Sequence, residues 1–322
     1  MRKFFYKVTY YPLWALWYSL SLLPLRLHYA FASIFYFLVV HVFRYRRKVI
    51  MKNLRNAFPN KTEHEREQIA NGFYHFFSDF IAETLKYGTM SRDSIMRHMV
   101  VKNIEEVNRI LESGQSVALF LGHYGNWEWV TSLCLWIINR DDIAMGQVYH
   151  PLENEAMDRV FLNVRNRMGS QCIAMRETLR WIINVKSKGW TSIVGYIADQ
   201  VPTWENIHHW TTFMHQETPV FTGMERIARS QNQAVVYIDV KCVKRGYYEL
   251  DMQVVTRDPK SLPENEITNE CFRRLEATIE RAPQYWLWSH NRWKRTREEF
   301  DRRYTTVNGR VVKLEGPQPP KD

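Results

Sequence analysis

A histidine and a glutamate near the middle of the chain are the residues best suited to acid–base chemistry. His123 and Glu128 lie in the segment GHYGNWEW, directly after the apolar run VALFL at 117–121. On one continuous helix, positions five apart point about 140° away from each other. With His123 in a turn and Glu128 in the first turn of a helix that begins near Asn126, the carboxylate can reach the imidazole. Such a pair fits a general base acting on an alcohol, although a capped helix with an incidental histidine has the same residues.

A second polar pair follows another apolar segment. Asp199 and Gln200 come directly after the strand candidate at 192–198. Polar side chains at the carboxyl end of a strand often face a ligand, while an aspartate in this position can also simply form a turn. Both residues are therefore candidates for binding a substrate or an oxyanion.

Metal chemistry is not indicated by the histidines and cysteines. His208, His209 and His215 stand in a Trp-rich loop with Glu205 and Glu217, but their irregular spacing favours a polar loop over a metal site. The four cysteines form no CxxC pair and suggest a reducing compartment. We expect neither a metal nor a cofactor.

The order of apolar segments predicts the scaffold that holds these residues. Short β-rich runs alternate with segments of helical periodicity, which indicates an α/β fold with a mostly parallel central sheet flanked by helices. Strands are expected at 117–121, 143–149, 192–198, 234–240 and 248–255, and helices at 62–87, 126–138, 153–168, 176–188, 222–231 and 264–281. A content of 45% hydrophobic and 24% charged residues is that of a packed domain and excludes disordered and collagen-like chains.

The chain carries an excess of basic residues. Its 44 lysines and arginines outnumber 34 acidic residues, which gives a net charge of +10. Anionic partners are therefore expected, and charge alone leaves nucleic acid, anionic lipid and acidic protein open. The 12 tryptophans favour an amphipathic surface that meets lipid or a partner.

The first 45 residues are predicted to form a helical membrane anchor. Residues 8–25 carry no formal charge, and a second apolar stretch runs from 29 to 43. Eighteen residues just reach the length that a helix needs to cross a bilayer core. Trp14, Trp17 and Tyr18 are typical of the membrane interface. A cleaved signal peptide and a buried core hairpin are the alternatives.

A basic segment follows the apolar one and predicts its orientation. Between 44 and 55 the chain has no acidic residue but six basic ones, namely Arg44, Arg46, Arg47, Lys48, Lys52 and Arg55. Such a cluster favours the cytoplasmic side and attracts anionic headgroups. We therefore expect an anchor at 1–45, a globular domain at 46–304 and a C-terminal tail at 305–322, disordered over 316–320.

The chain resembles the bacterial lipid A biosynthesis acyltransferases, the lauroyl and myristoyl transferases that are distant relatives of the glycerolphosphate acyltransferases. GHYGNWEW is similar to the H-x4-D/E block of this family, and further blocks follow in the same order. They are YHPLEN at 149–154, IADQ at 197–200, the segment 213–228 and PQYWLWSHNRWK at 283–294. The likeness spans roughly residues 5–300.

This resemblance implies a glycerolphosphate-acyltransferase-like fold and acyl transfer from a thioester, usually on acyl carrier protein, to a hydroxyl of a glycolipid precursor. The reaction would take place at the cytoplasmic face of the inner membrane. At the matched positions His123 is the general base and Glu128 its orienting partner. The acceptor alcohol attacks directly, without a covalent enzyme intermediate, and the chain indeed lacks a G-x-S-x-G segment.

Other matched or nearby residues are expected to bind substrate or the oxyanion: Asn126, His150, Arg165, Arg167, Arg176, Asp199, Gln200, His290, Arg292 and Lys294. Two positions depart from the family. His150 stands where arginine or lysine is common, and Asn291 where many members have arginine. A neutral imidazole holds a phosphate or polarises a carbonyl less well than a cation does, so the arginines near 165–176 are candidates to supply the charge.

Two other classes of function are compatible with parts of the sequence. A catalytically silent lipid-binding protein would keep the same fold, which His150 mildly favours and the His123–Glu128 pair argues against. A nucleic-acid-binding protein would use the basic and aromatic residues at 286–295, but no recognised nucleic-acid motif accompanies them, and we expect no such partner. Within acyl transfer, lipid A precursors, phosphatidylinositol mannosides, lysophospholipids and aminolipids remain possible acceptors.

Overall fold

The computed structural model describes residues 2–307 and 309–316, and its centre is a seven-stranded sheet with the order β1-β9-β8-β2-β5-β3-β4. The strands are β1 (Met99–Lys102), β2 (Val117–Leu121), β3 (Ile143–Tyr149), β4 (Gln171–Ala174), β5 (Thr191–Ile197), β8 (Ala234–Lys244) and β9 (Tyr247–Thr256). All neighbouring strands run parallel except β8 and β9, which form an antiparallel pair. The expected α/β fold with a mostly parallel sheet is confirmed.

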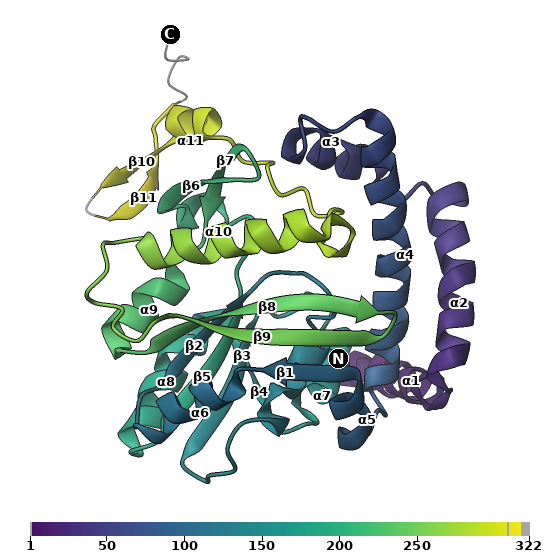
Figure 1. Cartoon of the computed structure of the whole chain (residues 1–322), viewed down its shortest axis with the longest axis horizontal. Helices are drawn as coiled ribbons and strands as arrows, with labels where there is room; N and C mark the ends of the chain where they lie inside the picture. Colours follow the sequence, from purple (N-terminus) through teal and green to yellow (C-terminus); the bar gives the residue numbers. More distant parts are fainter. Residues whose placement is uncertain (1, 308, 317–322) are drawn as a thin grey trace.

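Helices from Arg47 onward pack on this sheet, on one another or on shorter strands outside it. They are α3 (Arg47–Ala57), α4 (Glu63–Tyr87), α5 (Arg92–His98), α6 (Ile104–Glu112), α7 (Glu155–Asn166), α8 (Thr178–Ser187), α9 (Gly223–Gln231), α10 (Glu266–Arg281) and α11 (Arg297–Arg303). Helix α10 packs against β8 and β9 and lies along them in Figure 1. Helix α4 begins with a capping box in which Thr62 and Glu65 bond each other's backbone N–H groups, which explains its sharp start.

Strand β2 shows how the sequence places the candidate base. All five of its residues, VALFL, are buried. A strand with parallel neighbours on both sides and helices on its faces is apolar throughout rather than alternating. Its carboxyl end after Leu121 therefore delivers the following turn to the edge of the sheet, where ligands bind in open α/β folds.

Most expected elements lie nearly at their expected bounds, with one change of type. The helix expected at 126–138 is instead a short 3₁₀ helix, η2 (Trp129–Leu135). The structure adds β1, β4 and two hairpins, β6–β7 (His209–Phe213 and Gln216–Val220) and β10–β11 (Tyr304–Val307 and Arg310–Lys313). The β10–β11 hairpin occupies the start of the region expected as a tail, while the expected disorder at 316–320 falls, apart from Gly316, outside the described residues.

Two helices precede the domain, α1 (Arg2–Leu22) and α2 (Leu25–Phe37), and α2 continues into a π-helical turn, η1 (Leu38–Val42). Pro24 separates them because the residue before a proline avoids the helical conformation. Figure 1 shows α2 lying along α4, where the Tyr36 ring stacks on His75 at 3.6 Å between centroids. Among the described residues, Leu25–Val42 is the one helix long and apolar enough to cross a membrane, judged by length and composition.

Candidate active site

His123 and Asp199 are brought together by the pairing of β2 with β5. The two strands run parallel, with Leu121 opposite Ile197. His123 and Asp199 each stand two residues beyond that pair, so both emerge at the same edge of the sheet. Nδ1 of His123 lies 2.6 Å from Oδ1 of Asp199. Strand order therefore creates an imidazole–carboxylate pair between residues that are 76 positions apart.

Asp199 is 1% exposed and well supplied with hydrogen-bond donors. Its Oδ2 accepts the backbone N–H of His123 at 2.9 Å and the indole N–H of Trp286 at 2.8 Å. Burial by itself raises a carboxyl pKa, but the nearby imidazole and the donors outweigh burial and lower the pKa of Asp199 to about 2. The ionised carboxylate accepts the Nδ1–H of His123, which leaves the lone pair on Nε2.

The second ring nitrogen of His123 is the one available for proton transfer. Its partner is the side-chain amide of Gln200, whose Nε2 lies 3.2 Å from Nε2 of His123. The His123 side chain remains 18% exposed, and the Trp127 ring stands edge-on to it at 5.2 Å. A hydroxyl group that binds at Nε2 would have to displace the Gln200 amide.

The expected contact between Glu128 and His123 is wrong. Glu128 accepts two hydrogen bonds from the guanidinium of Arg165 on α7, at 2.7 and 2.6 Å. Both side chains are largely buried, with exposed fractions of 7% and 22%. A planar guanidinium binds a carboxylate with two parallel hydrogen bonds, which a neutral imidazole cannot do. The carboxylate therefore faces α7, and Asp199 fills the place that Glu128 was expected to hold.

The C-terminal block PQYWLWSHNRWK lies against the turn that carries His123. Tyr124 and Trp286 form an isolated antiparallel bridge, and the N–H of Leu287 donates to the carbonyl of His123 at 3.1 Å. This backbone pairing sets the Trp286 indole on Asp199. Sequence reasoning did not predict Trp286 as a site residue. Its place in the segment 283–294, which resembles a family block, and its indole N–H donor were the features that could have indicated it.

Arg292 and His290 in the same block stand in the electrostatic field of Asp199. Arg292 is fully buried and donates from Nη2 to the carbonyl of Pro219 at 2.7 Å, while its Nε and Nη1 find no partner among the described residues. Burial lowers the pKa of Arg292 to about 9, with the charge of Asp199 opposing it. Burial also lowers the pKa of His290 to about 4, so that imidazole is neutral near pH 7.

The remaining expected site residues have other surroundings. His150 is exposed after β3 and contacts the carbonyl of Pro151 through Nδ1 at 3.0 Å. Arg167 donates to two backbone carbonyls at the end of α4, and Arg176 and Lys294 are exposed. Within the described residues, none of these four side chains hydrogen-bonds His123 or Asp199.

The two glycines beside His123 are required by close packing. A Cβ on Gly122 would stand 2.6 Å from Cδ1 of Leu275 and 3.3 Å from Oδ2 of Asp199. Gly125 has φ +60°, and a Cβ there would stand 2.8 Å from Val240. Side chains at either position would push the His123 turn away from Asp199 and from the sheet.

The described residues contain no group of three or more potential metal ligands. In the His-rich loop, Nε2 of His209 hydrogen-bonds the Asn269 side chain at 2.8 Å, and the segment continues into the β6–β7 hairpin. His209, His215 and Glu217 thus belong to this hairpin, while Glu205 and His208 precede it.

Comparison with known proteins shows the family of the chain. A family model described as bacterial lipid A biosynthesis acyltransferase matches residues 2–295. The chain is 23% identical over 255 residues to the lipid A biosynthesis palmitoleoyltransferase of Escherichia coli (strain K12), covering 77% of this chain and 79% of that protein. It is 19% identical over 285 residues to the lipid A biosynthesis acyltransferase of Haemophilus influenzae, covering 85% and 86%. The chain belongs to the bacterial lipid A biosynthesis acyltransferase family and is an acyltransferase of lipid A biosynthesis.

Proposed function

We propose that the protein moves a fatty acyl chain from an acyl carrier protein thioester to a hydroxyl of a lipid A precursor, with His123 as general base and Asp199 as its orienting carboxylate. The observation that carries this proposal is the His123–Asp199 pair. Nδ1 of His123 lies 2.6 Å from the Asp199 carboxylate, and Nε2 contacts the side-chain amide of Gln200, which a substrate hydroxyl can displace. A base of this kind suits attack by an alcohol, and its position at the carboxyl ends of parallel strands suits a bound substrate.

The reaction proceeds by direct transfer. The acceptor hydroxyl binds at Nε2 of His123, which takes its proton as the oxygen attacks the thioester carbonyl. Asp199 stabilises the imidazolium that forms. The tetrahedral intermediate then expels the thiolate of the carrier, which receives the proton from His123. An ester bond replaces a thioester bond, and the enzyme returns to its starting state.

Arg165 is the cation that we assign to the developing oxyanion or to a substrate phosphate. Glu128 accepts two hydrogen bonds from its guanidinium, and the centroid of the Phe161 ring lies 4.9 Å from the guanidinium carbon. A guanidinium fixed on two sides loses little freedom when it meets an anion. His150, Arg176 and Lys294 remain further candidates for the phosphates because their side chains are exposed.

The proposed transfer is tested with the purified full-length protein. The protein is incubated with a lipid A precursor and each of a series of acyl carrier protein thioesters, and the masses of the lipid products are measured by mass spectrometry. We expect a mass gain of one acyl group that depends on the donor. A precursor whose mass stays unchanged with every donor, under conditions in which the Escherichia coli relative acylates it, would overturn the proposal.

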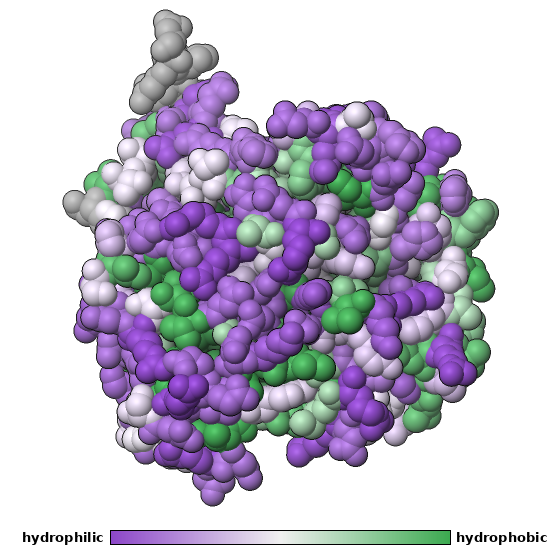
Figure 2. All heavy atoms as spheres, in the orientation of Figure 1, coloured by the Kyte–Doolittle hydropathy of each residue, from purple (hydrophilic) through white to green (hydrophobic). Residues whose placement is uncertain are grey.

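We further propose that the protein works on the cytoplasmic face of the inner membrane, with α1 and α2 in contact with the bilayer. More than half of the exposed large apolar side chains among the described residues lie between Tyr11 and Phe43, and Phe43 itself is 71% exposed. Figure 2 shows hydrophobic atoms along the edge formed by α2. An exposed apolar surface of this extent favours insertion into a lipid interface.

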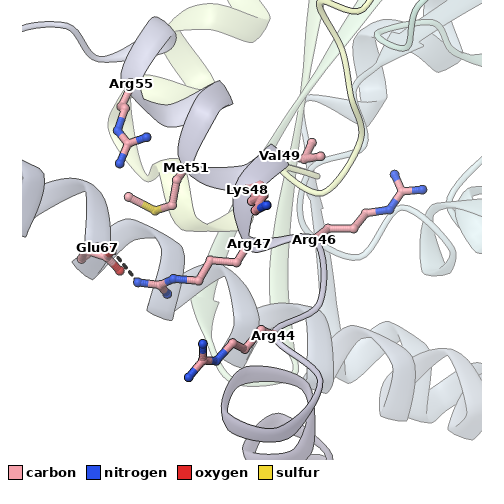
Figure 3. A pocket seen from close by; sticks show the side chains of 8 residues that line it. All are labelled: Arg44, Arg46, Arg47, Lys48, Val49, Met51, Arg55 and Glu67. Carbon is pink, nitrogen blue, oxygen red and sulfur yellow. Dashed lines mark hydrogen bonds and ion pairs between the residues drawn. The ribbon is translucent and has the colours of Figure 1, made fainter.

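A basic cleft next to this surface supports the same orientation. A cavity of about 700 Å³ is lined by Arg44, Arg46, Arg47, Lys48, Val49, Met51, Arg55 and Glu67 (Figure 3). Glu67, the one acidic residue of this lining, pairs with Arg47 at 2.6 Å. The cleft keeps a net positive charge, which suits the phosphates of anionic lipids.

Charge reversal in the basic cleft is expected to weaken binding to anionic membranes. Each basic residue near a membrane surface contributes about 1 kcal/mol, so Arg44→Glu with Lys48→Glu lowers binding to phosphatidylglycerol vesicles by at least about 30-fold, the effect of losing the two attractions alone. Co-sedimentation with the vesicles measures the change. The matched control reverses Lys186 and Lys188, two exposed cations at the end of α8, and retains binding. Equal losses in both double variants would contradict a role for this cleft.

A further inference from the structure

A fully buried carboxylate lies behind the His123 turn, and no cation among the described residues forms an ion pair with it. Glu83 on α4 is 0% exposed. The nearby Arg245 forms its ion pair with Asp79, one helical turn away, and not with Glu83. Burial raises the pKa of Glu83 to about 7. An unpaired buried carboxylate is costly, so the contacts that it makes require an explanation.

Three neutral donors from three separate elements meet at this carboxylate. Oε1 of Glu83 accepts the hydroxyl of Tyr29 on α2 at 2.9 Å. Oε2 accepts the amide of Asn126 at 2.7 Å and the hydroxyl of Tyr248 on β9 at 2.8 Å. The backbone carbonyl of Glu83 also accepts the indole N–H of Trp129 at 3.1 Å. Glu83 therefore joins the N-terminal helix, the sheet and the turn after His123.

The contact with Asn126 determines which way that amide points. While its Nδ2 donates to Glu83, its Oδ1 accepts the backbone N–H of Trp129, the first residue of η2, at 3.1 Å. A rotated amide would turn its oxygen to the carboxylate and its NH₂ to another N–H group, and both contacts would repel. In its ionised form, which predominates above about pH 7, the Glu83 carboxylate accepts hydrogen bonds only and so enforces this orientation.

Through Asn126 the carboxylate also controls Glu128. Glu128 is the residue directly before η2, two positions after Asn126, and its side chain binds Arg165. A shift of this turn moves the ion pair. Misplacement of a catalytic group by about 1 Å can cost roughly 100-fold in rate, even when the substitution is remote from the chemistry.

We propose that Glu83 is a positioning residue, whose carboxylate holds Asn126 and thereby the turn that carries Glu128 and Arg165 in the geometry used for acyl transfer. This inference rests on the proposed function for its effect on rate. Its structural part, the orientation of the Asn126 amide, can be measured without any substrate.

The test uses Glu83→Gln and a rescue variant with inverted polarity. The glutamine introduced in Glu83→Gln can turn an NH₂ group toward the NH₂ of Asn126, and we expect kcat to fall by about 10-fold to 100-fold while KM changes little. In Glu83→Gln with Asn126→Asp, the new glutamine donates to the new aspartate, which still accepts the N–H of Trp129. We expect this double variant to recover most of kcat.

A second buried carboxylate provides the matched control. Glu225 is 2% exposed and accepts three hydrogen bonds from residues 265–268, where it caps α10. Glu225→Gln is expected to lower thermal stability while transfer per folded molecule is retained. A wild-type kcat in Glu83→Gln would show that Glu83 has only a structural role. The same conclusion would follow if Glu83→Gln and Glu225→Gln both lowered the folded fraction and neither lowered kcat per folded molecule.

Hydrogen exchange separates this inference from the proposed function. We expect residues 126–135 to exchange faster in Glu83→Gln, to regain protection in the double variant, and to remain unchanged in Glu225→Gln. If the wild-type protein transfers no acyl group, the proposed function fails while the exchange data still decide whether Glu83 holds the turn. Unchanged exchange in Glu83→Gln would overturn the positioning role.

Discussion

His123→Ala is expected to lower acyl transfer by about 1,000-fold, because general-base catalysis contributes about 10² to 10⁴ in rate. The variant keeps the backbone N–H that donates to Asp199, so the turn itself retains one of its contacts. Transfer is measured as the rate of appearance of acylated lipid under saturating donor. The loss should appear in kcat, since the imidazole acts on the proton that moves in the transition state.

His64→Ala is the matched control for this substitution. His64 is exposed near the start of α4 and contacts only the Gln68 side chain among the interactions of the described residues. We expect wild-type transfer from it. If His123→Ala kept more than about a tenth of the wild-type rate, at a folded fraction equal to that of the control, His123 could not be the general base.

Asp199→Asn is expected to have the second-largest effect, a loss of about 100-fold to 1,000-fold. The carboxylate accepts the Nδ1–H of His123 and so keeps the lone pair on Nε2. An asparagine that turns its NH₂ toward the ring favours the opposite tautomer, in which Nε2 carries the proton and cannot accept another. Single-turnover rates at several pH values measure the change.

The pH dependence of stability provides a check on the charge of Asp199. Its pKa in the folded protein, about 2, lies below the ordinary value of 3.8. The stabilisation is therefore fully present above about pH 4 and is lost as the pH falls toward 2. Urea unfolding across this interval should show a steeper loss for the wild type than for Asp199→Asn. Equal slopes would mean that Asp199 is not held as an ion by His123 and Trp286.

Asp239→Asn serves as the control for loss of a carboxylate. Asp239 on β8 pairs with Arg281 at 2.8 Å, and its side-chain hydrogen bonds within the described residues are with Thr278 and Arg281, not with His123. We expect transfer per folded molecule to be retained. A rate loss equal to that of Asp199→Asn would indicate a general effect of removing a charge from this face of the sheet.

The position of the proposed base was predictable from sequence, but its partner was not. His123 follows a short apolar run and is flanked by glycines, and both features report local requirements for burial and close approach. Glu128 is the nearest carboxylate along the chain, yet its side chain meets Arg165. Asp199 stands out in the sequence at the end of its own strand, and only the adjacency of β2 and β5 shows that the two residues meet.

The strands that sequence reasoning missed are short or belong to antiparallel hairpins. Strands β1 and β4 have four residues each, too few for a periodic pattern to stand out. The contact network of Glu83 was equally hidden, because a glutamate in an amphipathic helix is expected at the surface. Its burial results from the docking of α2 and β9 on either side of α4.

By itself, the amino-acid sequence determined the fold class, the apolar N-terminal region, the family and the histidine that we assign as the base. These properties depend on burial patterns and residue types that each segment carries locally. The tertiary structure decided which carboxylate orients His123, which cation Glu128 holds, and that an unpaired glutamate lies beneath the turn. These contacts join segments far apart in the chain, and they form only once strand order and helix packing have placed those segments side by side.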